Sequence, residues 1–109
     1  MNNLLFLCSR NQWRSPTAEV IFKNKPGIDV KSAGTEPSAR VRVNAKHIAW
    51  ADVILVMEQK HKRRIVEMFR EEIGHRKIVV LDIPDNYQFM DPELVEEITS
   101  RVNVLALFR

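Results

Sequence analysis

Short apolar runs alternate with segments of helical periodicity along almost the whole chain. Four of these runs predict strands, at residues 4–7, 28–32, 53–57 and 77–81. The runs at 4–7 and 53–57 are continuously apolar, as is typical of parallel strands that are buried on both faces. The alternation constrains the chain to an α/β fold, in which helices joined by right-handed crossovers cover both faces of a parallel sheet.

Residue types that favour helix ends mark several boundaries. Ser15 suits the N-cap of the first helix, and Pro16 suits its first position. Asn44 can cap a short helix that follows a loop at residues 35–43. Gly34, which comes after the second apolar run, is expected to turn the chain.

Two further helices carry apolar stripes. One is expected at residues 60–73, before Gly74, and the other starts at Asp91-Pro92. Their expected buried faces are Ile65, Met68, Phe69 and Ile73 in the first, and Leu94, Val95, Ile98, Val102 and Leu105 in the second. We interpret the charged run Lys60-His61-Lys62-Arg63-Arg64 as a solvated helix face.

Length and composition favour a small soluble protein. The 109 residues fit one domain, 1–109, around one modest core. No apolar run approaches the roughly 18 residues that span a membrane, and the N-terminus lacks signal-peptide features, so we expect a cytoplasmic protein and no membrane partner. The net charge of +3 favours anionic ligands, but we expect no nucleic-acid partner.

The single cysteine of the chain, Cys8, begins a loop between the first predicted strand and the first predicted helix. The backbone N–H groups of such a loop, together with the helix N-terminus, can hold an anion, and the same positive potential favours a nucleophilic thiolate. Arg14, six residues later, adds a planar fork that fits two phosphoryl oxygens. The loop therefore predicts a cysteine that attacks phosphorus; the alternative is a buried structural cysteine.

Two carboxylates are expected on the same edge of the sheet as Cys8. Ligands of parallel sheets bind beyond the carboxyl ends of the strands. Cys8 follows the first predicted strand, and Asp82 and Asp85 follow the fourth. The two halves of a site can therefore meet there.

With these segments, the chain resembles the low-molecular-weight protein tyrosine phosphatase family, in a short, bacterial-type form. The resemblance covers nearly the whole chain in the segments Cys8 to Pro16, Ser32-Ala33-Gly34-Thr35, Ala51 to Met57, Ile83 to Tyr87 and Asp91 to Ile98. It implies a three-layer sandwich with sheet order 2-1-3-4. It also implies hydrolysis of phosphomonoesters, foremost phosphotyrosine in proteins, through a phosphocysteine intermediate.

The resemblance also implies roles for individual residues. Cys8 is the expected nucleophile, Arg14 the ligand of the phosphoryl oxygens and Asp85 the general acid, with Asp82 as its rival. The other residues expected to bind substrate are Ser9, Arg10, Asn11, Gln12, Trp13, Ser15 and Tyr87. Typical members have glycine at position 10 and a second cysteine at position 13, so this chain departs from the pattern in its loop.

Some of these roles have structural alternatives. Ser15 can donate to the Cys8 thiolate, cap the helix, or do both. Asn11 can shape the loop through side-chain hydrogen bonds or simply adopt a left-handed conformation. Tyr87 can stack on an aromatic substrate or pack in the core.

Other functions remain open at this point. A thiol-dependent arsenate reductase shares the loop, but with one cysteine this chain would need an external thiol. A cysteine-phosphorylated phosphocarrier is disfavoured by Arg14, and a non-catalytic phosphate-binding module remains possible. We expect no cofactor and no metal, since the histidines lack ligand spacing. The expected partners are a phosphorylated protein or a small phosphomonoester, with phosphate- or sulfate-like anions in the loop.

Overall fold

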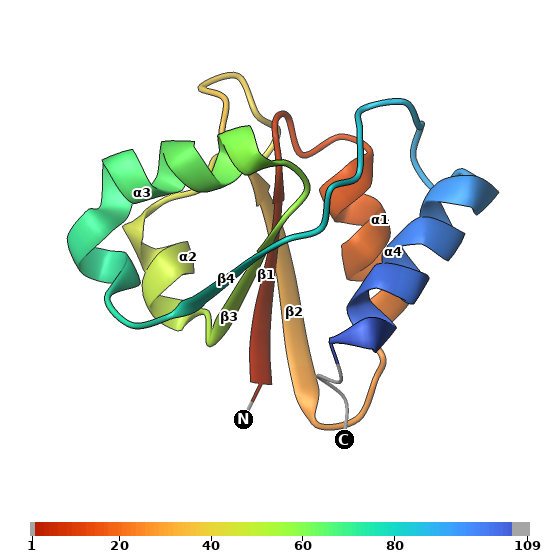
Figure 1. Cartoon of the computed structure of the whole chain (residues 1–109), viewed down its shortest axis with the longest axis horizontal. Coiled ribbons are helices and arrows are strands. Elements are labelled where there is room, and N and C mark those ends of the chain that lie inside the picture. Colours follow the sequence, from red (N-terminus) through yellow and green to blue (C-terminus); the bar gives the residue numbers. More distant parts are fainter. Residues whose placement is uncertain (1, 106–109) are drawn as a thin grey trace.

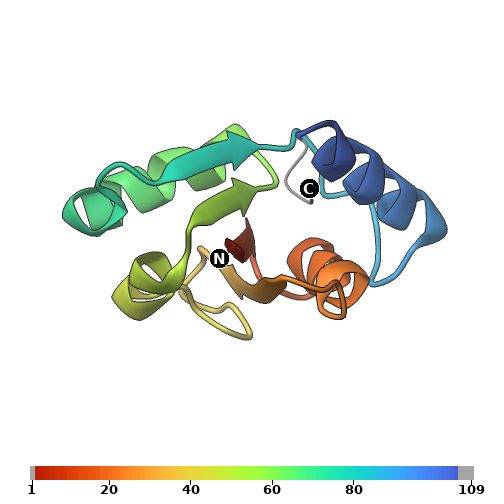
Figure 2. The same ribbon diagram turned by 90° about the horizontal axis from the view of Figure 1, so that it is seen from below.

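The computed structural model describes residues 2–105. Along this stretch the elements are β1 (Asn2–Cys8), α1 (Arg14–Phe22), β2 (Ile28–Gly34), α2 (Ala45–Trp50), β3 (Val53–Val56), α3 (Gln59–Ile73), β4 (Lys77–Val80) and α4 (Pro92–Val104). The strands pair in parallel in the order β2-β1-β3-β4. Helices α1 and α4 cover one face of the sheet, and α2 and α3 cover the other (Figures 1 and 2). The predicted fold and strand order are therefore confirmed.

The central strand β1 places Cys8 at a point where ligands commonly bind. Successive side chains of β1 point to opposite faces, so Phe6 and Cys8 pack toward α1 and α4, while Leu5 and Leu7 pack toward α2 and α3. From β1 the chain crosses to β2 on one side and later to β3 on the other. The carboxyl end of β1 is thus the switch point of the sheet, and Cys8 is its last residue.

The first helix begins one residue earlier than Ser15, so the predicted N-cap is wrong. Trp13 occupies the N-cap position and makes no side-chain capping bond. Ser15 lies in the first turn, where its hydroxyl is 3.0 Å from the Cys8 sulfur. By contrast, the predicted cap of α2 is confirmed, since the Asn44 side chain accepts from the backbone N–H of His47 at 3.0 Å.

Helix α3 buries a histidine that the sequence analysis assigned to a solvated face. His61 is 1% exposed and lies on the same stripe as Ile65 and Ile73. The assignment of residue 61 to the solvent is therefore wrong. Met68, which was expected in the core, is 38% exposed, and the backbone of Phe69 departs from helical angles. With 3.6 residues per turn, Met68 lies to one side of the row formed by His61 and Ile65, which accounts for its exposure.

Helix α4 packs on the sheet through Leu94, Ile98 and Val102, all fully buried, as predicted. Val95 and Leu105 are only partly buried. None of the helices within residues 2–105 is long and apolar enough to cross a membrane.

Gly34 ends β2 without turning the chain, contrary to the prediction. Its φ is not positive. A Cβ at this position would lie 2.6 Å from the carbonyl oxygen of Ser9 and 2.6 Å from the Cβ of Ala39. Glycine therefore permits the close approach of β2 to the loop after Cys8.

Candidate active site

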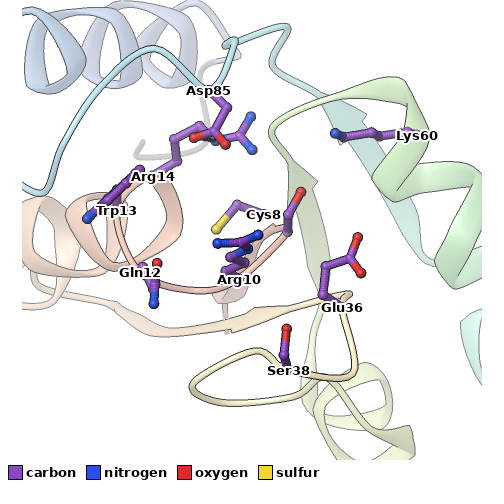
Figure 3. A pocket seen from close by; sticks show the side chains of 10 residues that line it. Cys8, Arg10, Gln12, Trp13, Arg14, Glu36, Ser38, Lys60 and Asp85 are labelled. Carbon is purple, nitrogen blue, oxygen red and sulfur yellow. Dashed lines mark ion pairs between the residues drawn. The ribbon is translucent and has the colours of Figure 1, made fainter.

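A cavity of about 410 Å³ opens at the carboxyl edge of the sheet, over Cys8 (Figure 3). Its walls come from the loop after β1, the segment after β2, the start of α3 and the loop after β4. The lining residues are Cys8, Ser9, Arg10, Gln12, Trp13, Arg14, Glu36, Ser38, Lys60 and Asp85. The predicted meeting of the Cys8 loop with the segment after β4 is confirmed.

The segment after β2 binds the outer side of the loop after β1 through hydrogen bonds. Four consecutive carbonyls accept hydrogen bonds from this segment. The carbonyls of Cys8 and Ser9 accept from the backbone N–H groups of Thr35 and Glu36, respectively, both at 2.9 Å. The carbonyl of Arg10 accepts from the backbone N–H of Arg40, and that of Asn11 from its Nε, both at 3.0 Å. Since these carbonyls point away from the cavity, the loop N–H groups are left to face inward. An anion-binding loop requires this orientation.

Cys8 is 3% exposed, and its sulfur is surrounded by hydrogen-bond donors. The backbone N–H of Asn11 donates to Sγ at 3.3 Å, and the Ser15 hydroxyl lies 3.0 Å away. The Nδ2 group of Asn11 donates to the hydroxyl oxygens of Ser15 and Ser32, at 2.8 and 2.9 Å. Because Ser15 accepts from Asn11, its own hydrogen can go either to the Cys8 sulfur at 3.0 Å or to the carbonyl oxygen of Ala33 at 3.3 Å. The Asn11 N–H and the Ser15 hydroxyl can donate hydrogen bonds to the Cys8 sulfur.

Asn11 combines both features that the sequence left as alternatives. Its φ is +56°, in the left-handed region that asparagine tolerates well. Its side chain also joins the loop to β2 through Ser32. Asn11 and Ser15 lie behind the sulfur and do not line the cavity.

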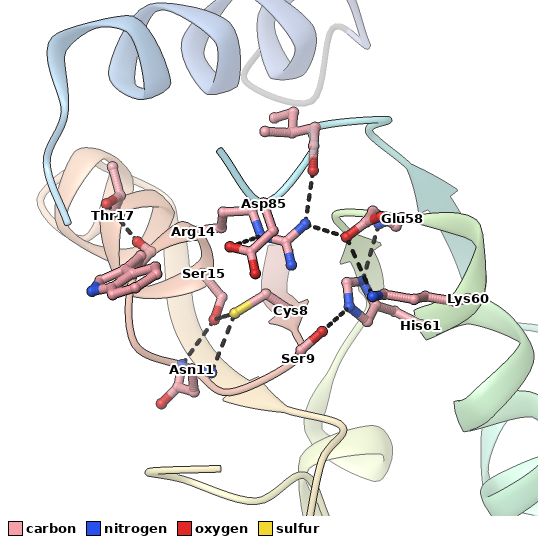
Figure 4. A network of polar contacts seen from close by, with 12 residues as sticks. Cys8, Ser9, Asn11, Arg14, Ser15, Thr17, Glu58, Lys60, His61 and Asp85 are labelled. Carbon is pink, nitrogen blue, oxygen red and sulfur yellow. Dashed lines mark hydrogen bonds and ion pairs between the residues drawn. The ribbon is translucent and has the colours of Figure 1, made fainter. Parts of the chain in front are cut away.

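Arg14 is the largest fully buried side chain of the site, at 2% exposure. Its Nη1 atom donates to Oε2 of Glu58 at 2.5 Å and to the carbonyl of Ile83 at 2.8 Å (Figure 4). Its Nε atom lies 3.6 Å from Oδ1 of Asp85. Burial alone would raise the pKa of Glu58, but the hydrogen bond and charge of Arg14, together with the charges of Lys60 and His61, outweigh it and lower this pKa. The ion pair thus fixes the guanidinium at the base of the cavity.

The two candidate acids occupy different places. Asp85 lines the cavity together with Cys8 and is 55% exposed. Asp82, with a φ of +56°, lies in a separate surface hollow beside Lys60 and Arg63. Tyr87 does not line the cavity and packs, half-buried, against the core under α1 and α4.

Two residues near the site, Glu58 and His61, were missed by the sequence analysis. Glu58 lies two residues past the end of β3, at the same edge of the sheet as Cys8 and Asp85. His61 lies four residues before Ile65, so the helical period itself places it on the buried stripe. Within residues 2–105, no group of three or more His, Cys, Asp or Glu side chains is arranged to hold a metal ion.

Comparison with known proteins links this geometry to cysteine-dependent phosphatases. No protein-family model matches the chain. A protein-arginine-phosphatase of Geobacillus stearothermophilus is 36% identical over a match that covers 62% of this chain, and the match spans only 62% of that relative's length. The solved structure of the YwlE arginine phosphatase from the same organism has a TM-score of 0.78 and 27% identity, and covers 97% of this chain and 91% of that one. The tyrosine phosphatase Wzb of Escherichia coli K30, in complex with phosphate, has a TM-score of 0.79 and 20% identity, covers 96% of both chains, and supports the fold.

Proposed function

Because this chain belongs to the low-molecular-weight protein tyrosine phosphatase family, as its sequence suggested, we propose that it removes phosphoryl groups from phosphorylated proteins through a phosphocysteine intermediate. The observation that carries the proposal is the position of the Cys8 sulfur. It lies among hydrogen-bond donors in a cavity that Arg14 and Asp85 also line. The phosphate bound by the Wzb structure supports an anion in the corresponding loop here.

In the first step, the Cys8 thiolate attacks phosphorus in line with the leaving oxygen. The bond from phosphorus to that oxygen breaks, and the protonated Asp85 carboxyl donates its proton to the leaving group. Glu58 and the Ile83 carbonyl hold the Nη1 corner of Arg14. The Nε and Nη2 atoms of the guanidinium, with Nε 3.6 Å from Oδ1 of Asp85, can bind two phosphoryl oxygens beside the loop N–H groups.

In the second step, water releases the phosphoryl group. The Asp85 carboxylate accepts a proton from the water as its oxygen bonds to phosphorus. The bond between phosphorus and sulfur breaks, inorganic phosphate leaves, and Cys8 returns to the thiolate. In this cycle, Arg14 and the loop N–H groups offset the negative charge of the phosphoryl group, and Asp85 donates and accepts the proton. We infer a cytoplasmic location, since the cycle requires Cys8 to stay reduced.

Phosphotyrosine and phosphoarginine are the two candidate substrates. The sequence resemblance favours phosphotyrosine. Phosphoarginine is favoured by the protein-arginine-phosphatase relative and by the carboxylates of Glu36 and Asp85 in the cavity wall, which can bind a guanidinium. Peptides that carry either residue, assayed at equal concentration, separate the two.

Hydrolysis of p-nitrophenyl phosphate in the presence of EDTA tests the proposal. We expect turnover by the wild type and none by Cys8→Ser. A folded wild type that hydrolyses neither this ester nor either phosphopeptide would contradict the proposal and favour a non-catalytic phosphate-binding role. Arsenate reduction with an added external thiol tests the remaining alternative.

A further inference from the structure

His61 connects the start of α3 to the loop after Cys8. Its Nδ1 atom accepts a hydrogen bond from the backbone N–H of Glu58 at 3.0 Å. Its Nε2 atom lies 2.9 Å from the hydroxyl oxygen of Ser9 (Figure 4). The contact joins residues that are 52 positions apart and is the side-chain link between the loop and this helix.

These two contacts fix the protonation of the ring. An imidazole nitrogen that accepts from an N–H group carries no hydrogen, so Nδ1 is unprotonated. The proton of the neutral ring must then be on Nε2, which donates it to the Ser9 oxygen. A second proton on Nδ1 would face the Glu58 N–H, donor against donor. Burial, reinforced by the charge of Arg14, also lowers the pKa of His61 to about 4, with Lys60 lowering and Glu58 raising it.

The direction of this bond has a consequence for Ser9. Because the Ser9 oxygen accepts from His61, its own hydrogen is not used in that contact. Ser9 lines the cavity next to Cys8. The hydroxyl can therefore donate to an anion that is bound there, in addition to the backbone N–H groups of the loop.

We propose that His61 is a positioning residue, which orients the Ser9 hydroxyl as a side-chain donor to a bound phosphoryl oxygen. The inference deepens the proposed function and rests on its anion site. It does not require hydrolysis, because it concerns the binding of the phosphoryl group. Ser9 lies in the loop after β1 and His61 lies in α3, so the placement of α3 adjusts the affinity of the loop for phosphate.

Binding of inorganic phosphate, followed through tryptophan fluorescence, tests the proposal without an activity assay. Trp13 is 41% exposed, lines the cavity and can report on the loop. The variants are Ser9→Ala, Ser9→Thr, His61→Asn, His61→Gln and the double variant Ser9→Ala/His61→Asn. The Asn side chain replaces Nδ1 and keeps the acceptor for the Glu58 N–H, whereas the Gln side chain reaches the position of Nε2 and keeps a donor for Ser9. Circular dichroism verifies that each variant is folded.

We expect Ser9→Ala and His61→Asn each to weaken phosphate binding by roughly tenfold, the effect of losing one donor to a charged group. Since both changes remove the same donor, the double variant should bind no more weakly than Ser9→Ala alone. His61→Gln and Ser9→Thr should stay within about threefold of the wild type. A purely structural role of His61 would not produce this coupling or the rescue by Gln.

Three results would overturn the proposal. One is unchanged phosphate affinity in folded Ser9→Ala, which is decisive even if the His61 variants do not fold. The second is a double variant in which the losses of phosphate affinity caused by Ser9→Ala and His61→Asn multiply. NMR of the imidazole nitrogens at neutral pH gives the tautomer directly, and a ring protonated at Nδ1 would also refute it. If phosphate binds with this pattern but p-nitrophenyl phosphate is not hydrolysed, the proposed catalysis fails while the role of His61 stands.

Discussion

The Arg14 guanidinium and the Glu58 carboxylate meet at 2.5 Å, although 44 residues separate them in the chain. Arg14 is 2% exposed and Glu58 is 31% exposed, so the cation is withdrawn from solvent more fully than its partner. A buried cation is costly unless it is paired. Glu58 therefore both neutralises Arg14 and determines which edge of its fork can face an anion.

Removing the charge of Glu58 should destabilise the fold and strengthen the binding of phosphate. We expect Glu58→Gln to lower the free energy of unfolding by about 2 kcal/mol, because Arg14 loses its charged partner but keeps a hydrogen-bond acceptor. Phosphate should raise the Tm of this variant more than that of the wild type, since the anion replaces the missing charge. Thermal unfolding with and without phosphate measures both effects.

Glu97→Gln is the matched control. It breaks the exposed ion pair between Glu97 and Arg101, whose side chains are 43% and 45% exposed. Surface pairs of this kind contribute roughly 0–1 kcal/mol, so little change is expected. Equal stability losses in Glu58→Gln and Glu97→Gln would contradict the claim that the buried Arg14 depends on the charge of Glu58.

Only one of the two aspartates should act as the general acid. We expect Asp85→Asn to lower kcat for phenyl phosphate by roughly a hundredfold, within the range for general acid catalysis. The loss for p-nitrophenyl phosphate should be smaller, because its leaving group needs less protonation. Steady-state kinetics with both esters provides the comparison. Asp82→Asn, outside the cavity, should retain near wild-type rates, and the reverse pattern would assign the acid to Asp82.

The fold and the meeting of Cys8 with Asp85 were predictable because both follow from a parallel sheet. Apolar runs define the strands, and the carboxyl ends of parallel strands share one edge. The partners of Arg14 were not predictable in the same way. The sequence indicates that an arginine follows the loop, but whether it is buried depends on Glu58 and Ile83, which reach it from the segments after β3 and β4.

The errors of the sequence analysis have a similar cause. Ser15 has the right residue type for a cap, but tertiary structure uses its hydroxyl at the Cys8 sulfur. His61 lies within a run of charges, and only its spacing from Ile65 indicates burial. Gly34 looks like a turn residue, whereas its lack of a side chain serves the approach of Ser9 and Ala39. In each case a contact between distant segments overrides the local preference.

A methyl group at position 34 should displace the loop. The added Cβ of Gly34→Ala would lie 2.6 Å from the Ser9 carbonyl oxygen, and this backbone atom cannot move without the loop. We expect a loss of about 2 kcal/mol of unfolding free energy, as for overpacking, and a several-fold increase in KM for p-nitrophenyl phosphate. Urea denaturation and steady-state kinetics measure the two effects.

Gly27→Ala separates the loss of stability from the change in KM. Gly27 has a φ of +81° and open space around it, so alanine there strains the backbone far from the cavity. Stability should fall while KM stays unchanged. Should KM also stay unchanged in Gly34→Ala, the contact between Gly34 and the loop would have no role in binding.

His61 should make stability depend on pH. Its pKa is lowered from 6.5 to about 4 in the folded protein. At a pH between these values, the unfolded chain binds a proton that the folded protein does not bind, so the free energy of unfolding rises with pH across this window. We therefore expect a lower urea midpoint at about pH 4.5 than at about pH 7.

Replacing His61 should flatten this pH dependence. His61→Asn removes the titrating group, and its urea midpoint should vary less between the two pH values than that of the wild type. His75→Asn, at an exposed position after α3, is the control and should retain the wild-type dependence. A wild-type midpoint that is equal at both pH values would show that His61 titrates alike in the folded and unfolded states.

The most direct measurement is the mass of the intact protein after acid quenching during turnover of p-nitrophenyl phosphate, in EDTA. We predict a species heavier by one phosphoryl group in the wild type, with the group located on the peptide that contains Cys8. We predict no such species in Cys8→Ala and no turnover in Cys8→Ser. Turnover by folded Cys8→Ser, or wild-type turnover without any phosphorylated cysteine under rapid quenching, would contradict catalysis through Cys8.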